Sequence, residues 1–222
     1  MRRYLRDQLT FFSQFRQQFE TTGAVAPSSR FLANAMTGPL KKCESAKRVL
    51  EVGPGTGAVT QKIVQLIDLE DRFDLVEIND VFAEGLRRRF ENDPDYQQCA
   101  AVSEVHTCPL QEFPDTQPYD VIISGLPHSN FSPELVGELF ESYFRLLKPG
   151  GTLSFFEYMY VRSIRKRIGK RSERIRMKQL DEAAAPFVKN HQFKRNWVFV
   201  NIPPAWVLHL RKPESETINE TP

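Results

Sequence analysis

The sequence predicts an α/β fold, in which one mostly parallel β-sheet carries helices on both faces. Three observations lead to this fold class. Short apolar segments alternate with segments of helical periodicity along most of the chain, which is typical of parallel strands joined by crossover helices. The apolar run 49–52 leads into three alternating glycines, and the apolar run 73–76 ends at the acidic Glu77. Both patterns are expected where a strand meets a bound nucleotide.

The first strand ends in a turn that contains Gly53, Gly55 and Gly57. Alternating glycines leave the backbone without Cβ atoms where a ligand must come close, and residues 58–68 are predicted to form the helix behind the turn. A dinucleotide-binding turn has the wider spacing Gly-x-Gly-x-x-Gly. In addition, Glu51 would repel a diphosphate but suits a cation. These features disfavour a dehydrogenase.

The second strand, 73–77, ends at Glu77, about twenty residues after the glycine turn, where a carboxylate can accept the hydroxyls of a ribose. The turn and this acid together resemble motifs I and II of class I S-adenosylmethionine-dependent methyltransferases. The resemblance implies S-adenosylmethionine as the cofactor and S-adenosylhomocysteine as the product. It also implies a set of cofactor-binding residues: Glu51, Gly53, Pro54, Gly55, Thr56, Gly57, Glu77, Ile78, Cys108 and Ser124.

The remaining elements continue the alternation of strands and helices. Apolar residues recur at helical spacing in three further segments, which are predicted to be helices: 80–91, 133–147 and 161–178. Pro133 and the Lys-Pro-Gly-Gly turn 148–151 mark the limits of the second of these helices. Short apolar runs predict five more strands: 101–107, 119–124, 152–158, 197–201 and 205–210. Turns are predicted at Asn92-Asp93-Pro94 and Pro203-Pro204.

Length and composition fit a single domain with a sizeable core, since the chain has 222 residues, of which 41% are hydrophobic and 26% charged. We expect three regions. Residues 1–30 are predicted to be an N-terminal amphipathic helix and a substrate-side segment, residues 31–212 the catalytic domain, and residues 213–222 a polar, disordered tail.

The cysteines and the apolar runs limit the kind of protein. Cys43, Cys99 and Cys108 are odd in number and lack CxxC or Cys/His ligand spacing, so neither a disulfide framework nor a metal site is predicted. No run approaches the length of a membrane-spanning helix, and the N-terminus lacks an apolar signal core. These features predict a cytoplasmic protein.

Positive charge is concentrated in residues 161–178, which carry nine basic residues against Glu173 alone. Because the net charge of the whole chain is only +2, this segment is a local patch that favours an anionic surface. Apolar residues recur near helical spacing among the cations, which is typical of a helix lying in a membrane interface. We therefore predict membrane contact through Arg162, Arg165, Lys166, Arg167, Lys170 and Arg171.

The N-terminal segment repeats this pattern. Its apolar residues fall on one helical side, among several arginines: Leu5, Leu9, Phe12, Phe15 and Phe19. Such a terminal helix fits packing against the core as well as membrane contact. The basic segment also has two other interpretations, a solvated helix face or a nucleic-acid patch, because phosphate attraction alone does not distinguish lipid from RNA. Together the two segments favour reversible docking at the inner face of the cell membrane.

Three further stretches carry a closer resemblance: GAVAPSS at 23–29, SGLP at 124–127 and NIPPA at 201–205. They are similar to signature stretches of the bacterial phospholipid N-methyltransferase family, and the similarity runs over about residues 12–210. It implies a Rossmann-like, seven-stranded sheet of order 3-2-1-4-5-7-6 with an antiparallel seventh strand. It also implies that the substrate is phosphatidylethanolamine, methylated stepwise toward phosphatidylcholine at the cytoplasmic membrane face.

In methyltransferases of this class the fourth strand ends beside the reacting methyl group. The catalytic loop is therefore expected to be Gly125, Leu126, Pro127 and His128, with His128 as a candidate acceptor of the amine proton. Amine and adenine methyltransferases carry an aromatic residue where His128 stands, and its loss favours a flexible alkyl amine over a stacked adenine. Hydroxyl and guanidinium groups suit a lipid phosphate, and the candidates are Tyr4, Ser28, Ser29 and Arg30.

The sequence departs from the family on the adenine side, where Thr107-Cys108-Pro109-Leu110 stands in place of Gly-Asp-Ala. We expect Cys108 or a loop amide to replace the missing acid. The leading function is a lipid N-methyltransferase acting at an anionic membrane surface, without a metal. Three alternatives stay open: a methyltransferase of another aminolipid such as an ornithine lipid, an RNA or protein N-methyltransferase that uses the basic helix, and a non-enzymatic membrane-binding module. A nucleic-acid partner is disfavoured.

Overall fold

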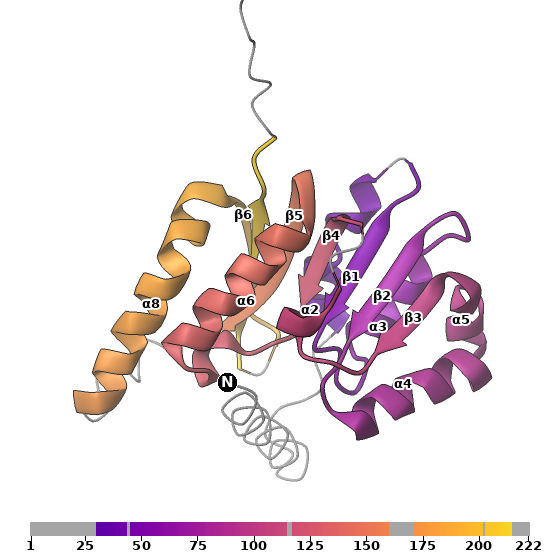
Figure 1. Cartoon of the computed structure of the whole chain (residues 1–222), viewed down its shortest axis with the longest axis horizontal. Coiled ribbons are helices and arrows are strands. Elements are labelled where there is room, and N and C mark those ends of the chain that lie inside the picture. Colours follow the sequence, from indigo (N-terminus) through magenta and orange to yellow (C-terminus); the bar gives the residue numbers. More distant parts are fainter. Residues whose placement is uncertain (1–29, 44, 115–116, 160–170, 202, 215–222) are drawn as a thin grey trace, which may run out of the picture.

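The computed structural model describes residues 30–43, 45–114, 117–159, 171–201 and 203–214. Within them the chain forms a seven-stranded sheet of order β3-β2-β1-β4-β5-β7-β6 (Figure 1). The first five strands are mutually parallel, and β7 is antiparallel to both of its neighbours. The predicted strand order and the antiparallel seventh strand are confirmed. The strands are β1 Arg48–Val52, β2 Arg72–Val76, β3 Ser103–His106, β4 Tyr119–Ser124, β5 Leu147–Tyr158, β6 Gln192–Val198 and β7 Ala205–Arg211.

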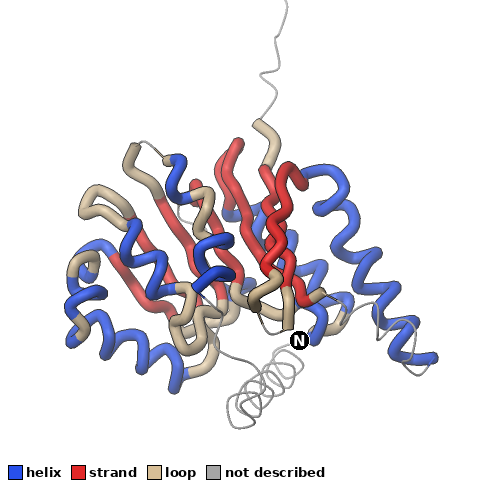
Figure 2. Tube along the Cα trace, turned by 180° about the vertical axis from the view of Figure 1, so that it is seen from behind, coloured by secondary structure: helices blue, strands red, loops and turns tan. Residues whose placement is uncertain are grey.

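Helices cover both faces of this sheet (Figures 1 and 2). Successive side chains of a strand point to opposite faces, so that Val49 joins one core and Leu50 the other. The first core contains α2 Arg30–Met36, α3 Thr60–Ile63, α4 Asp80–Asn92 and α5 Pro94–Gln97. The second contains α6 Pro133–Leu146 and α8 Arg171–His191. The described residues also contain short 3-10 turns: η1 Leu40–Lys42, η2 Val64–Leu66, η3 Ala100–Val102, η4 Leu110–Glu112 and η5 His128–Asn130.

Side-chain caps fix where helices α4 and α6 begin. The Asn79 side chain accepts hydrogen bonds from the amides of Val81 and Phe82, which starts α4 directly after the second strand. Ser132 accepts from the Leu135 amide at the start of α6, where Pro133 occupies the first turn.

Several predicted boundaries are wrong. A strand was predicted over 197–201, but β6 spans Gln192–Val198. The prediction failed because this strand at the sheet edge is mostly exposed and lacks a clear apolar alternation. The basic helix does not stop at residue 178, since α8 continues to His191 on a core-facing row that includes Met177, Leu180 and Ala184. The predicted helix 58–68 is divided into α3 and η2, and Pro94 starts α5 instead of closing a turn. The turn 148–151 lies within β5.

The carboxyl ends of the parallel strands meet at one edge of the sheet, at the bottom of Figure 1. Three backbone hydrogen bonds continue the ladder just past the strand ends: the Gly53 amide donates to Val76, the Glu77 amide to His106, and the Gly125 amide to Val52, at 2.8 to 3.0 Å. The residues that follow β1, β2, β3 and β4 are thereby aligned. We call this side of the molecule the carboxyl edge.

The structure also bears on the cysteines and on the predicted terminal and basic segments. Cys43, Cys99 and Cys108 are all free thiols. Among the described helices, none combines the length and apolar character that crossing a membrane requires. The predicted N-terminal helix, residues 161–170 of the predicted basic helix 161–178, and the tail 215–222 lie outside the described residues.

Candidate active site

The glycine turn after β1 is closely packed against the loop after β4. Gly53, Gly55 and Gly57 all have positive φ angles, 67°, 56° and 81°, which residues other than glycine rarely adopt. A Cβ atom on Gly53 would lie 2.3 Å from the Cδ2 atom of Leu126. A Cβ atom on Gly125 would lie 2.6 Å from the carbonyl oxygen of Gly53. The two turns therefore approach each other so closely that both positions require glycine.

Glu77, directly after β2, joins the turn to the next helix. Its side chain is 1% exposed. One carboxylate oxygen accepts the Gly55 amide at 2.9 Å, and the other accepts the Asn79 amide at 3.0 Å. A single buried carboxylate thus orients both the glycine turn and the start of α4, at the position where the sequence predicts a ribose-binding acid.

A pocket of about 460 Å³, counting its open mouth, lies at this edge. It brings together five predicted site residues: Gly53, Glu77, Ile78, Cys108 and Leu126. The other lining side chains are mainly apolar and come from the η4 segment and α6: Leu110, Phe131, Leu135 and Leu139. One buried carboxylate in the lining of an apolar slot fits an adenosyl group, whose ribose needs hydrogen-bond acceptors and whose base needs apolar contact.

The adenine-side loop lines the same pocket. Burial raises the pKa of the Cys108 thiol, and the charge of Glu112 raises it further. A thiol held neutral in this way is a contact group and a poor nucleophile. Gln111 is a lining residue that the sequence did not reveal, and its amide offers hydrogen-bonding groups where the family's acid is missing. No sequence signal distinguished it from a surface glutamine.

Glu51 and Gly57, two of the predicted cofactor-binding residues, do not line this pocket. Glu51 is fully buried and accepts a hydrogen bond from the Thr60 hydroxyl at 2.7 Å, on the α3 side of the sheet. A Cβ atom on Gly57 would meet Leu86, Arg89 and Tyr96, so Gly57 faces helices α4 and α5. Neither residue lines the pocket at the carboxyl edge, which Gly53 of the same turn does line.

The remaining predicted turn residues lie beside these. Pro54 is buried, and its carbonyl oxygen accepts the Gly57 amide at 3.0 Å, which closes the turn. Thr56 lines a second, more open hollow together with Gly57 and Arg30. Arg30, a predicted phosphate-binding residue, thus lies beside the glycine turn. Tyr4, Ser28 and Ser29, the other candidates for the phosphate, lie outside the described residues.

The loop after β4 is held by Tyr143 of α6. The Tyr143 hydroxyl lies 2.8 Å from the Ser124 hydroxyl and 3.2 Å from Nε2 of His128. Ser124 also accepts the Leu126 amide at 3.3 Å. Tyr143 is fully buried, and burial raises its pKa, so the phenol stays protonated. Sequence analysis missed Tyr143 because its helical spacing marks it only as a core residue.

His128 itself is 5% exposed. Its ring packs among aromatic side chains, with the centroids of Phe140 and Phe155 each 5.3 Å away. This packing, together with the hydroxyl of Tyr143, fixes the orientation of the imidazole. Ser124, predicted to contact the cofactor, is fully buried beneath the loop and acts on the loop geometry.

Of the predicted membrane-binding residues, Arg171 is the first residue of α8 and is exposed. The other five, Arg162, Arg165, Lys166, Arg167 and Lys170, lie outside the described residues.

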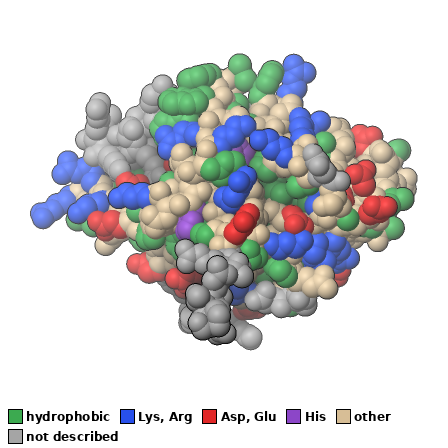
Figure 3. All heavy atoms as spheres, turned by 90° about the horizontal axis from the view of Figure 1, so that it is seen from above, with side chains coloured by type: hydrophobic (Ala, Val, Ile, Leu, Met, Phe, Trp, Pro, Cys, Tyr) green, Lys and Arg blue, Asp and Glu red, His purple; other side chains and the backbone are tan. Residues whose placement is uncertain are grey.

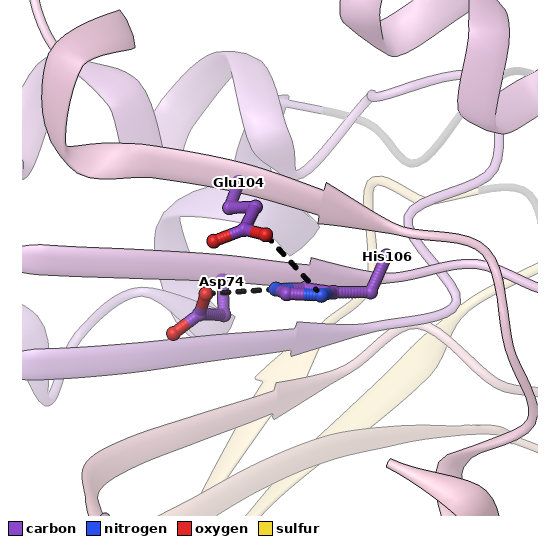
Figure 4. A group of neighbouring side chains, drawn as sticks. All are labelled: Asp74, Glu104 and His106. Atoms are coloured by element: carbon purple, nitrogen blue, oxygen red, sulfur yellow. Dashed lines mark hydrogen bonds and ion pairs between the residues drawn. The ribbon is translucent and has the colours of Figure 1, made fainter. Parts of the chain in front are cut away.

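A second polar cluster lies between β2 and β3, where Asp74, Glu104 and His106 bring candidate metal-ligand atoms within 4.8 Å of one another (Figure 4). Asp74 is already engaged by His106 at 2.9 Å, by Arg72 at 2.7 Å and by the Tyr119 hydroxyl at 2.8 Å. Burial alone would raise the pKa of Asp74, but these hydrogen bonds outweigh it and lower the pKa to about 2. The bound guanidinium makes the cluster a structural network that joins strands.

Comparison with known proteins agrees with this geometry. Residues 49–151 match the family model described as a methyltransferase domain. The chain is 30% identical over 150 residues to the ornithine lipid N-methyltransferase of Singulisphaera acidiphila, an alignment that covers 68% of this chain and 77% of that protein.

Solved structures share the fold. An O-methyltransferase from Bacillus cereus in complex with S-adenosylhomocysteine superposes with a TM-score of 0.61 over 90% of each chain, at 15% identity. The O-methyltransferase TomG from Streptomyces achromogenes, in complex with S-adenosylmethionine, gives 0.59 at 16% identity, over 85% of this chain and 81% of that one. With the predicted Rossmann-like topology confirmed, and with this family match and this relative, the chain belongs to the class I S-adenosylmethionine-dependent methyltransferases.

Proposed function

We propose that this methyltransferase acts at a membrane surface on the amine headgroup of a lipid, with phosphatidylethanolamine methylated stepwise toward phosphatidylcholine. The observation that carries the proposal is the relative that aligns over most of its own length, which is named for N-methylation of an aminolipid. The cluster of cations in residues 161–178 supports it, because such a cluster attracts anionic headgroups.

The described residues suit the requirements of N-methylation. Glu77 and the apolar slot hold the adenosine, and the glycine turn leaves room for the methionine part. Bound S-adenosylmethionine supplies an electrophilic methyl group, so the protein mainly has to position a neutral amine in line with it. The loop Gly125–His128 lies beside Gly53 and is the part of the site best placed to receive that amine.

Proton removal must precede attack, because an ammonium group has no lone pair. His128 is the titratable side chain of the loop, and Tyr143 fixes its Nε2 atom. In the proposed mechanism His128 takes the amine proton directly or through water, and Tyr143 maintains the orientation of the ring. The rings of Phe140 and Phe155 pack against His128 and keep the imidazole in this orientation.

An ornithine lipid is the second candidate substrate, because the aligned relative bears that name. Both lipids present a primary amine near an anionic group, so the same loop would serve either. Methylation assays with each lipid alone distinguish the two candidate substrates.

The class of acceptor can be tested with a membrane-containing cell extract and radiolabelled S-adenosylmethionine. After incubation the extract is separated into lipid, RNA and protein, and label in each fraction is compared with that from the Glu77→Ala variant. The proposal predicts label in the lipid fraction that depends on the intact pocket. Label confined to RNA or protein would show that the basic segment serves a different substrate.

A further inference from the structure

Large apolar side chains are exposed mostly on one side of the molecule. The described residues include eight large hydrophobic side chains with high exposure, and two of these, Leu69 and Phe193, lie at the amino ends of strands. The other six lie at the carboxyl edge: Phe31, Val81, Ile175, Trp197, Phe199 and Val200. Figure 3 views the opposite side, where basic, acidic and hydrophobic side chains are interspersed.

The largest exposed group is the end of the β6–β7 hairpin. Trp197, Phe199 and Val200, which we call the apolar tip, are 57%, 62% and 62% exposed. The Trp197 and Phe199 rings stack with centroids 5.7 Å apart, which presents two aromatic faces to solvent as one surface. Within the turn, the buried Asn201 side chain donates to the Pro203 carbonyl at 2.8 Å. The turn is therefore internally braced.

The hairpin register places the apolar tip at the carboxyl edge. Ala205 pairs with Tyr158 at the end of β5, and the Met159 amide donates to the Pro204 carbonyl at 2.7 Å. In the sheet order, β4 lies between β1 and the β5–β7–β6 group. Along the carboxyl edge, the loop after β4 therefore lies next to the glycine turn after β1, and the apolar tip lies farther along on the other side, beyond the end of β5.

Basic residues accompany this apolar surface. The Arg176 guanidinium donates to the carbonyls of Phe131 at 2.9 Å and Ser129 at 3.3 Å, which ties the first turns of α8 to the loop after β4. On the same turns Arg171 and Arg174 are exposed and form no ion pair with any described residue. Ile175, which lies between Arg174 and Arg176 in the sequence, is also exposed.

We propose that the apolar tip is an interfacial anchor, which inserts into the headgroup region of an anionic bilayer and seats the carboxyl edge on the membrane. The inference rests on the proposed function, since it gives the lipid amine its route to the loop after β4. A bilayer fits better than a protein partner because the surface combines a tryptophan, an adjacent phenylalanine and two exposed arginines that have no ion-pair partner among the described residues. Tryptophan favours the membrane–water interface, and the arginines complement anionic headgroups.

The position of Trp197 can be read directly from its fluorescence. The chain has two tryptophans, and Trp206→Phe leaves Trp197 as the reporter. The buried indole nitrogen of Trp206 has no hydrogen-bond partner among the described residues, so this substitution should be tolerated. Vesicles of phosphatidylcholine and phosphatidylglycerol should shift Trp197 emission to the blue, and brominated acyl chains should quench it. Bound protein with unchanged emission would overturn the proposal.

Paired variants separate the apolar tip from general hydrophobicity. Phe199→Ser with Val200→Ser should weaken vesicle binding about tenfold or more, because two buried side chains are lost from the interface. Leu69→Ser, an equally exposed residue at the other edge, should leave binding unchanged. Calorimetry with S-adenosylmethionine confirms that each variant is folded. Equal binding by the tip variant and the wild type would exclude the anchor, as would a tip-dependent dimer in light scattering.

The outcomes distinguish this inference from the proposed function. Tip-dependent vesicle binding without methylation of any aminolipid would support the anchor and refute the proposed substrate. Aminolipid methylation that the tip variant leaves unchanged, with unchanged binding, would support the substrate and refute the anchor.

Discussion

Gly125 lies directly against Gly53, since a Cβ atom on Gly125 would come within 2.6 Å of the Gly53 carbonyl oxygen. The Gly125 amide also donates to the Val52 carbonyl at 2.8 Å. The loop after β4 and the glycine turn after β1 are therefore held in one fixed relation by backbone atoms. Because a backbone oxygen cannot move aside as a flexible side chain can, this contact constrains both loops.

Gly125→Ala should consequently lower the free energy of unfolding by about 1–3 kcal/mol and weaken S-adenosylmethionine binding. Chemical denaturation and calorimetry measure the two effects. Gly85→Ala is the matched control, because a Cβ atom there meets no other atom within 4 Å. It should stabilise α4 by about 0.5–1 kcal/mol. If Gly125→Ala were as stable and as tight-binding as the wild type, the close contact would be wrong.

Glu77→Ala should weaken S-adenosylmethionine binding about 10- to 100-fold, because it removes the predicted ribose acceptor and the partner of the Gly55 amide. Calorimetry measures the dissociation constant. Glu91→Ala, an exposed acid on α4, serves as the control. Undiminished affinity in Glu77→Ala would contradict the ribose assignment.

His128→Ala should lower turnover about 100-fold or more while cofactor affinity stays the same, as expected for a lost proton acceptor. The pH profile of the rate should also lose its acidic limb. Equal turnover, or loss of cofactor binding along with it, would argue that His128 acts only in packing.

Tyr143→Phe removes the hydroxyl that joins Ser124 and His128. It should reduce the free energy of unfolding by about 1–3 kcal/mol, because buried polar groups lose a partner. Turnover should fall less than in His128→Ala, since the imidazole remains. A Tyr143→Phe enzyme with a wild-type rate and stability would show that the network does not orient the loop.

Asp74→Asn should lower the free energy of unfolding at neutral pH by about 2 kcal/mol, because the pKa of Asp74, about 2, lies below its ordinary value of 3.8. A lowered pKa gives stability that is present above the unfolded-state pKa and lost as the pH falls through the folded-state pKa. The difference from the wild type should therefore shrink between about pH 4 and pH 2. The exposed Glu70→Gln is the control, and a difference independent of pH would contradict the assignment.

The sequence predicted well what local chemistry determines. The glycine turn, Glu77 and the fourth strand are recognisable because a strand end beside a nucleotide needs particular residue types. It predicted less well what tertiary packing determines. β6 has no clear strand pattern because it lies at the sheet edge, and Tyr143 has no signal apart from a helical core position.

The site shows the same division. Glu51 and Gly57 belong to the recognised motif, yet their side-chain environments lie on the far side of the turn. Spacing along the chain could not show which side of the turn each residue faces. The exposure of Trp197 and Phe199 likewise depends on where the hairpin ends relative to the rest of the sheet.

Product analysis on defined vesicles tests the central claim most directly. Purified protein and S-adenosylmethionine are incubated with vesicles that contain phosphatidylethanolamine, ornithine lipid or only phosphatidylcholine and phosphatidylglycerol, and the lipids are resolved by mass. The account predicts successive single-methyl additions to an aminolipid and none in vesicles without one. Unmodified aminolipids, with a cofactor-loaded enzyme bound to the vesicles, would contradict it.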